Sequence, residues 1–236
     1  MALEQARERH VHGRRRGKRL TARRQRLVDE LLPSLVLPAG GASLDALALF
    51  GDSRPLWLEI GFGGGEHLAW QARHHRDIGF LGAEPFINGV ASLLAAVEDD
   101  DLVNVRIEAD NIVPVLERLA PASLARVFVL FPDPWPKARH HKRRIVNADF
   151  VARLAEVMAD GAELRLATDD MAYARWMMTV LGANACFRWT ARRPADWRQR
   201  PADWPETRYE AKARGAGRCP VFLRFVRRER ALTAEG

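Results

Sequence analysis

Short apolar runs alternate with longer amphipathic stretches through most of this chain. The runs predict strands at residues 56–60, 79–83, 103–107, 127–131, 163–167 and 220–228. Helical periodicity predicts helices at residues 25–32, 66–75, 86–97, 111–119, 149–159 and 171–181. Pro33 is expected to end the first helix, and Gly161 to end the helix that follows Ala148. Such alternation predicts an α/β domain whose parallel sheet is covered on both faces and binds ligands at the carboxyl ends of its strands.

Two segments depart from this pattern. Residues 1–26 are rich in arginine and poor in large apolar side chains, so we expect an N-terminal arm that is mobile without a partner, followed by one domain at 27–236. Residues 191–206 contain several prolines together with Trp197 and Trp204. They predict an exposed insertion, either a substrate-contacting loop or, as we favour, a packed flap.

The charge of the chain indicates the class of its partner. The net charge is +7 and the sequence pI about 10.2, and a basic surface attracts polyanions such as nucleic acids. The basic residues gather at 7–26 and at 139–144. No apolar run approaches the roughly 18 residues of a membrane span, and Cys186 and Cys219 fit neither a metal site nor a redox pair. We therefore expect a cytoplasmic protein without a metal, as a monomer or homodimer.

A glycine loop follows the first predicted strand. Gly61, Gly63 and Gly65 alternate there, whereas a dinucleotide site places its third glycine three residues after the second. Glu59, just before the loop, favours a cationic or ammonium-bearing ligand. S-adenosylmethionine is cationic at sulfur and has no phosphate, so the loop suits this cofactor better than NAD.

Two acidic positions follow the next two strands. Glu84 ends the second strand, at about the separation from the glycine loop at which a carboxylate accepts ribose hydroxyls. Asp110, followed by Asn111, follows the third strand. It either accepts from an adenine amino group or is the N-cap of the next helix.

A proline-rich loop follows the fourth predicted strand. Its sequence is Phe131-Pro132-Asp133-Pro134-Trp135-Pro136-Lys137, and the basic cluster 139–144 comes directly after it. Three prolines in five residues stiffen the loop and fix its aspartate, tryptophan and lysine at a ligand-binding edge. We interpret it as a catalytic loop; the alternative is a rigid turn that buries Trp135.

These motifs together resemble the bacterial tRNA (guanine-N7)-methyltransferase family. The resemblance rests on Leu58–Gly63, on residues 131–146, on Ala167-Thr168-Asp169 and on Thr207-Arg208-Tyr209-Glu210, and it spans the chain from the basic arm to the last strand. It implies the class I methyltransferase fold: a three-layer sandwich around a mostly parallel sheet of about seven strands whose last strand is antiparallel. It also implies tRNA as the partner and, as the usual target, the guanine at position 46 of the variable loop. Asp170 and the ending Pro220–Leu223 depart from the family pattern.

The resemblance and the motifs assign the residues of the site. The cofactor residues are Glu59, Gly61, Gly63, Glu84, Asp110, Asn111 and Asp133. Asp133 is also the catalytic residue. The substrate residues are Lys137, Asp169, Thr207, Arg208, Tyr209 and Glu210, and the RNA contacts are Arg139, His140, His141, Lys142, Arg143 and Arg144.

Three alternatives remain open at this point. One is an amino methyltransferase acting on adenine or cytosine, since an aspartate, a proline and an aromatic residue also mark such sites. Another is a nucleic-acid-binding protein that has kept the fold without catalysis, although the intact glycine loop argues against it. The weakest is an NAD-dependent reductase, because of the glycine spacing.

Overall fold

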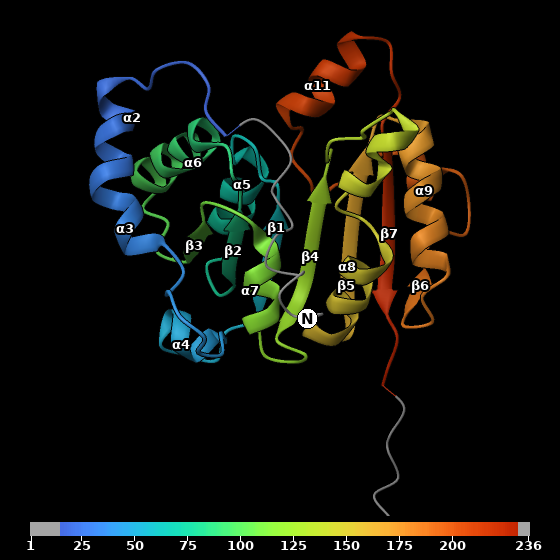
Figure 1. Ribbon diagram of the computed structural model, residues 1–236, viewed down its shortest axis with the longest axis horizontal. Coiled ribbons are helices and arrows are strands. Elements are labelled where there is room, and N and C mark those ends of the chain that lie inside the picture. The colour runs from blue at the N-terminus through green and yellow to red at the C-terminus, as the bar shows by residue number, and fades with distance from the viewer. Residues whose placement is uncertain (1–14, 231–236) are drawn as a thin grey trace, which may run out of the picture.

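A seven-stranded sheet forms the centre of the computed structural model, which describes residues 15–230 (Figure 1). The strand order is β3-β2-β1-β4-β5-β7-β6, and β7 alone runs antiparallel to its neighbours. The sheet and its antiparallel last strand are as expected. The strands are β1 Leu56–Ile60, β2 Gly79–Ala83, β3 Val105–Glu108, β4 Leu124–Leu130, β5 Met158–Thr168, β6 Phe187–Trp189 and β7 Val221–Arg227.

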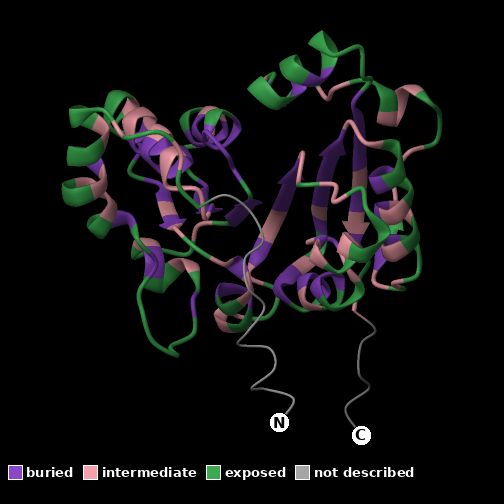
Figure 2. Cartoon of the chain, turned by 45° about the horizontal axis from the view of Figure 1, so that its top comes forward, coloured by how far each residue is buried: buried purple, intermediate pink, exposed green. Residues whose placement is uncertain are grey.

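Helices cover both faces of the sheet and make it the middle of three layers. One apolar core joins the sheet to α7, α8 and α9, and a second joins its other face to α5, α6 and the N-terminal helices. Figure 2 shows the strands buried between helices whose outer sides are exposed. The helices are α2 Ala22–Arg26, the π turn η1 Leu27–Leu31, α3 Leu32–Leu35, α4 Ala46–Phe50, α5 Glu66–His74, α6 Ile87–Asp100, α7 Ile112–Arg118, the 3₁₀ helix η2 Ala138–Arg143, α8 Ala148–Val157, α9 Met171–Gly182, α10 Ala195–Arg198 and α11 Arg208–Gly215.

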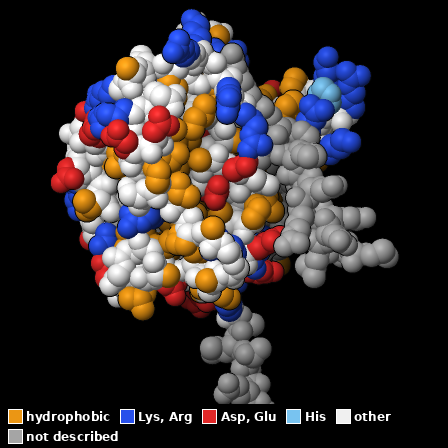
Figure 3. Space-filling view, turned by 60° about the vertical axis from the view of Figure 1, so that its left-hand side comes forward, with side chains coloured by type: hydrophobic (Ala, Val, Ile, Leu, Met, Phe, Trp, Pro, Cys, Tyr) orange, Lys and Arg blue, Asp and Glu red, His pale blue; other side chains and the backbone are white. Residues whose placement is uncertain are grey.

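The first helical segment differs from the prediction at both ends. It begins at Ala22, with Thr21 as its N-cap, so it starts inside the stretch 1–26 assigned to the arm. It also continues past Pro33 to Leu35, because the π turn η1 shifts the hydrogen bonding so that the proline lies in the first turn of α3, where no N–H is needed. Arg23 and Arg26 pair with Glu98 of α6, and Figure 3 shows basic and acidic side chains close together on this side.

The prediction for Gly161 is also wrong. Helix α8 ends at Val157, four residues earlier, and the chain enters β5 at once. Gly161 has φ +78° inside β5, where the pairing with β4 shifts register between Leu124 and Arg126. Its left-handed conformation therefore serves a strand irregularity instead of a helix end.

The segment 191–206 packs on the sheet. Trp204 is 4% exposed and its ring lies 5.5 Å from Phe222 and 6.4 Å from Phe128, centroid to centroid. Arg165 of β5 pairs with Asp203 at 2.7 Å. These contacts favour the packed flap over the substrate-contacting loop, and Trp204 is buried although the insertion was expected to be exposed.

Candidate active site

The glycine loop turns at the carboxyl end of β1 through left-handed backbone conformations. Gly61, Gly63 and Gly65 have φ of +71°, +58° and +79°, which side chains other than glycine adopt at a cost. A Cβ on Gly61 would meet no atom within 4 Å, so the loop leaves open space beside this glycine. A Cβ on Gly63 would lie 2.7 Å from the Tyr209 ring, so α11 covers the other side of the loop.

Glu84 holds the glycine loop from the end of β2. Its Oε2 accepts the Gly63 N–H at 2.7 Å, and its Oε1 accepts the Phe86 N–H at 2.9 Å. Burial raises the pKa of the Glu84 carboxyl, and the two backbone hydrogen bonds oppose that shift. Each oxygen keeps a further lone pair, so the carboxylate can still accept from ribose hydroxyls.

Glu59 lies buried beside the loop and bonds to a residue that the sequence analysis did not identify. Its Oε2 is 2.6 Å from Nδ1 of His67, and the two side chains are 5% and 1% exposed. His67 stands in the first turn of α5. The available signal was its position two residues after the last loop glycine, four residues before Gln71 on the same helix face.

The structure at the end of β3 decides whether Asp110 is the N-cap of the next helix. Asn111 is the N-cap of α7, because its Oδ1 accepts the Val113 N–H at 3.1 Å. Asp110 is therefore not the cap. Its carboxylate is half exposed and pairs with Arg15 at 2.5 Å, while the carbonyl of Arg15 accepts the Ile87 N–H. Residues just before α2 thus lie against the cofactor side of α6.

The proline-rich loop at the end of β4 holds two residues in the left-handed region. Phe131 has φ +52° and Trp135 has φ +45°. Such conformations cost on the order of 1–3 kcal/mol each and persist only when their surroundings hold them. Asp133 lies between these two residues and reaches solvent, yet the protein around it raises the pKa of its carboxyl by desolvation.

Arg144 holds this loop and is not an exposed RNA contact as expected. It is 3% exposed, its Nε donates to the Pro134 carbonyl at 2.8 Å, and its guanidinium lies over the rings of Tyr173 and Trp176. A buried guanidinium is not accessible to a phosphate. The prediction fails because the residue ends a charge run but turns into the core.

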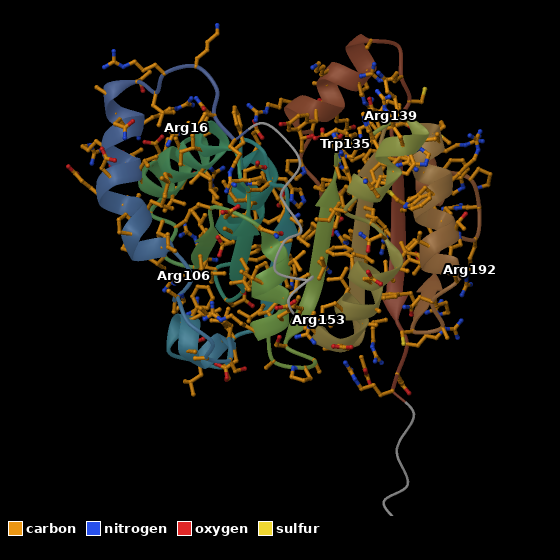
Figure 4. All side chains as sticks on the ribbon, in the orientation of Figure 1. Arg16, Arg106, Trp135, Arg139, Arg153 and Arg192 are labelled. Carbon is orange, nitrogen blue, oxygen red and sulfur yellow. The ribbon has the colours of Figure 1, made fainter. Side chains whose placement is uncertain are left out.

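The other basic residues of the cluster form η2 beside the loop, and Figure 4 shows Trp135 and Arg139 at the same edge of the molecule, near α11. Arg139 and Lys142 are exposed, as is Lys137 just before η2. The Arg143 guanidinium lies 4.9 Å from the Trp135 ring centroid. Partial burial, followed by the charge of Arg143, lowers the pKa of His140.

The expected substrate residues divide into two groups. Arg208 and Tyr209 lie at the glycine loop: Arg208 pairs with Glu66 at 3.4 Å, and Tyr209 covers Gly63. Thr207 and Glu210 serve α11 itself. Thr207 is its N-cap, and Glu210 is 1% exposed and accepts from Arg214 at 2.8 Å.

Asp169 lies at the end of β5, where its carboxylate pairs with Arg218 at 2.5 Å. Among residues 15–230 no group of three or more His, Cys, Asp or Glu side chains could hold a metal ion. In the same range every helix is too short or too polar to cross a bilayer.

The architecture has counterparts among solved structures. The crystal structure of an rRNA methylase from Streptococcus thermophilus superposes with a TM-score of 0.51 over 89% of this chain and 100% of that chain, at 10% sequence identity. This likeness shows the fold, which is that of the class I methyltransferases. A family model described as "Putative methyltransferase" matches residues 53–222.

Two curated relatives narrow the class. The tRNA (guanine-N(7)-)-methyltransferase of Rhodospirillum rubrum is 51% identical over 227 residues, covering 93% of this chain and 88% of the relative. The protein of the same name from Zymomonas mobilis is 44% identical over 219 residues, covering 93% and 94%. The chain belongs to the tRNA (guanine-N7)-methyltransferase family.

Proposed function

We propose that this protein transfers the methyl group of S-adenosylmethionine to N7 of a guanine in tRNA, at position 46 of the variable loop. The observation that carries the proposal is the set of carboxylates Glu59, Glu84 and Asp133 at the carboxyl ends of the adjacent strands β1, β2 and β4, next to the glycine loop. The relatives that bear this activity in their names cover nearly the whole chain.

The residues fit the cofactor. When bound, S-adenosylmethionine supplies an electrophilic methyl group on a positively charged sulfur. Glu59 would balance positive charge, Glu84 would accept the ribose hydroxyls, and Asp110 would accept from the adenine amino group. For Asp110 this requires release of Arg15, which pairs with it in this structure. Gly61 and Gly63 would bring the backbone close to the cofactor, and Asn111 would hold the α7 end of the site.

No general base is needed, because guanine N7 carries a lone pair and no hydrogen. Catalysis then depends on positioning and on stabilising the positive charge that develops on the purine. Asp133 has the place for both, at the tip of a stiffened loop with a desolvated carboxyl. Asp169 would accept from the N1 and N2 donors of guanine after exchanging its Arg218 partner, and Lys137 would face O6 or a nearby phosphate.

The exposed basic residues of η2 would contact the tRNA backbone, together with the basic arm 1–26. The part of the arm proposed to contact tRNA lies before α2, because the helical segment that begins at Ala22 runs on across the expected 26/27 boundary. Helix α11 would close the substrate side through Arg208 and Tyr209, while Thr207 and Glu210 would hold the helix itself. A protein acting on tRNA would work in the cytoplasm, where tRNA is used.

The test is to incubate the protein with labelled S-adenosylmethionine and bulk tRNA that lacks the modification, and to identify the labelled nucleoside. The expected product is 7-methylguanosine, at a position that cleaves after reduction and aniline treatment. Label in an amino-methylated adenine or cytosine would replace the proposal with that activity. Asp133→Asn should abolish most turnover, and a variant with normal turnover would exclude Asp133 from catalysis.

A further inference from the structure

A buried chain of hydrogen bonds links the glycine loop to the flap 191–206. From Glu59 it passes through His67 Nδ1, and His67 Nε2 lies 3.2 Å from Gln71 Nε2. Gln71 Nε2 also donates to the backbone carbonyl of Asp203 at 2.8 Å. His67 and Gln71 are 2% and 1% exposed, so no bulk water competes for these bonds.

The Asp203 carbonyl fixes the positions of the hydrogens along this chain. A carbonyl only accepts, so the Gln71 amide must present its NH₂ group, and the second N–H then points to His67 Nε2. That nitrogen accepts, which leaves the ring hydrogen on Nδ1 to donate to Glu59. Reversing the amide would set its oxygen against the Asp203 carbonyl oxygen. In this orientation the Gln71 Oε1 is buried and has no hydrogen-bond partner among the described residues, a cost that the two hydrogen bonds donated by Nε2 offset.

Aromatic packing prevents the imidazole from turning. The His67 ring meets Phe128 at 4.7 Å and Trp204 at 6.0 Å between centroids, both edge to face. The ring is therefore held in place, with Nδ1 facing Glu59 and Nε2 facing Gln71.

We propose that His67 is a positioning residue for the methyl donor. As a neutral imidazole with its hydrogen on Nδ1, it holds one oxygen of Glu59 and leaves the other for the ammonium group of the donor's amino-acid part. The flap sets this state through Gln71. The inference rests on the proposed function, because it assigns Glu59 to that donor.

Two ligands and two substitutions test the proposal by calorimetry. S-adenosylhomocysteine carries the amino-acid part, and 5′-methylthioadenosine lacks it. His67→Leu keeps an apolar side chain in this place but removes the N–H that donates to Glu59. It should weaken the binding of S-adenosylhomocysteine about tenfold or more, because a hydrogen bond to a charged group is lost. The binding of 5′-methylthioadenosine should not change. His67→Asn places an amide N–H near the position of Nδ1 and should restore most of the affinity. Thermal unfolding verifies that both variants are folded.

Each other result has a definite meaning. Normal binding of S-adenosylhomocysteine by His67→Leu, or equal weakening of both ligands, would overturn the role of His67 and leave the proposed function intact. Failure of the unmodified protein to bind S-adenosylhomocysteine would overturn the proposed function and this inference with it.

A second measurement does not depend on the folding of any variant. Nitrogen-15 spectra of the unmodified protein should show the His67 hydrogen on Nδ1 and a bare Nε2, and Gln71→Leu should release this preference. A hydrogen on Nε2 in the unmodified protein would break the proposed link to the flap.

Discussion

At the scale of single residues, Glu84 holds the glycine loop through a hydrogen bond and has a proposed role in binding ribose. We expect Glu84→Gln to weaken S-adenosylhomocysteine about tenfold or more at pH 7, because an amide offers one acceptor where the carboxylate offers two charged ones. The pKa of Glu84 is raised by burial, so affinity of the unmodified protein should fall as the pH drops from neutral through that raised pKa, and Glu84→Gln should lack this step. Calorimetry at several pH values measures both effects.

The same carboxyl should also affect the free energy of unfolding, but with the opposite dependence on pH. The unfolded chain loses the Glu84 proton at lower pH than the folded chain, so this residue lowers the free energy of unfolding as pH rises through that interval. Glu98→Gln, on the exposed side of α6, is the matched control and should leave binding unchanged. If the affinity for S-adenosylhomocysteine depended on pH in the same way in Glu84→Gln and in the unmodified protein, Glu84 would be excluded from the ribose site.

The residues that the sequence located correctly stand next to backbone signals. Glu59 lies in the last two residues of β1, Glu84 directly follows β2, and Asp133 comes three residues after β4, so their places at the sheet edge follow from the order of the strands. His67, Gln71 and Arg144 gave no such signal, since their roles depend on partners far along the chain or on which way a side chain turns. The sequence offered Asp110 as a possible N-cap of α7, but the cap is Asn111. The two positions differ by one residue, and only the backbone geometry distinguishes them.

At the scale of elements, the contact between α6 and the glycine loop is close enough to require glycine on both sides. A Cβ on Gly89 would lie 2.0 Å from the Gly63 carbonyl oxygen, and backbone atoms cannot step aside cheaply. Gly89→Ala should therefore lower the free energy of unfolding by about 1–3 kcal/mol, as overpacking does, and should weaken S-adenosylhomocysteine as the loop shifts. Chemical denaturation and calorimetry measure the two effects.

Gly182→Ala, at the end of α9, is the control for that substitution. A Cβ there meets no atom within 4 Å, so stability should stay the same or rise slightly. If Gly89→Ala behaved like this control, α6 would not support the loop as closely as the structure indicates.

The proline-rich loop 131–137, which we propose to be catalytic, is held by the buried Arg144. Arg144→Met should keep much of the packing on Tyr173 and Trp176 but lose the bond to the Pro134 carbonyl. We expect kcat to fall about tenfold to a hundredfold, since small displacements of a catalytic group are costly, while tRNA affinity and its salt dependence stay unchanged. Arg139→Met, exposed in the same segment, should give the reverse pattern. Weaker tRNA binding by Arg144→Met with normal kcat would return Arg144 to the RNA contacts.

Elements with an apolar stripe or run could be predicted, and those held by tertiary contacts could not. The strands β1 to β4 and the helices α5 to α9 were expected close to their observed bounds, whereas β5 begins five residues before the expected 163. Helix α11 is polar. It is held by its N-cap Thr207 and by the buried Glu210, which pairs with two arginines. No local hydrophobic periodicity predicts such a helix. The three-residue strand β6 is too short to give a pattern.

At the scale of the whole molecule, the basic residues that pair with acidic side chains and those that are exposed lie in different places. On the α2 side, arginines meet acidic partners of α6, whereas Arg139 and Lys142 of η2 are exposed beside the catalytic loop. A tRNA that presents a guanine at the strand ends would therefore meet the exposed positive charge of η2 beside the proline-rich loop. This arrangement would orient the substrate before any base contact forms.

The salt dependence of tRNA binding tests this orientation. The double substitution Arg139→Gln and Lys142→Gln should weaken the binding of tRNA. It should also reduce the slope of log Kd against log salt by about 1.5, because each phosphate contact contributes roughly 0.7 to 0.9 to that slope. Affinity for S-adenosylhomocysteine should not change, since neither side chain reaches the glycine loop. Arg192→Gln, on a side of the molecule away from η2 in Figure 4, is the control and should leave the slope unaltered. A double variant with the original slope would mean that the tRNA backbone crosses another part of the surface, and that the guanine reaches Asp133 without guidance from η2.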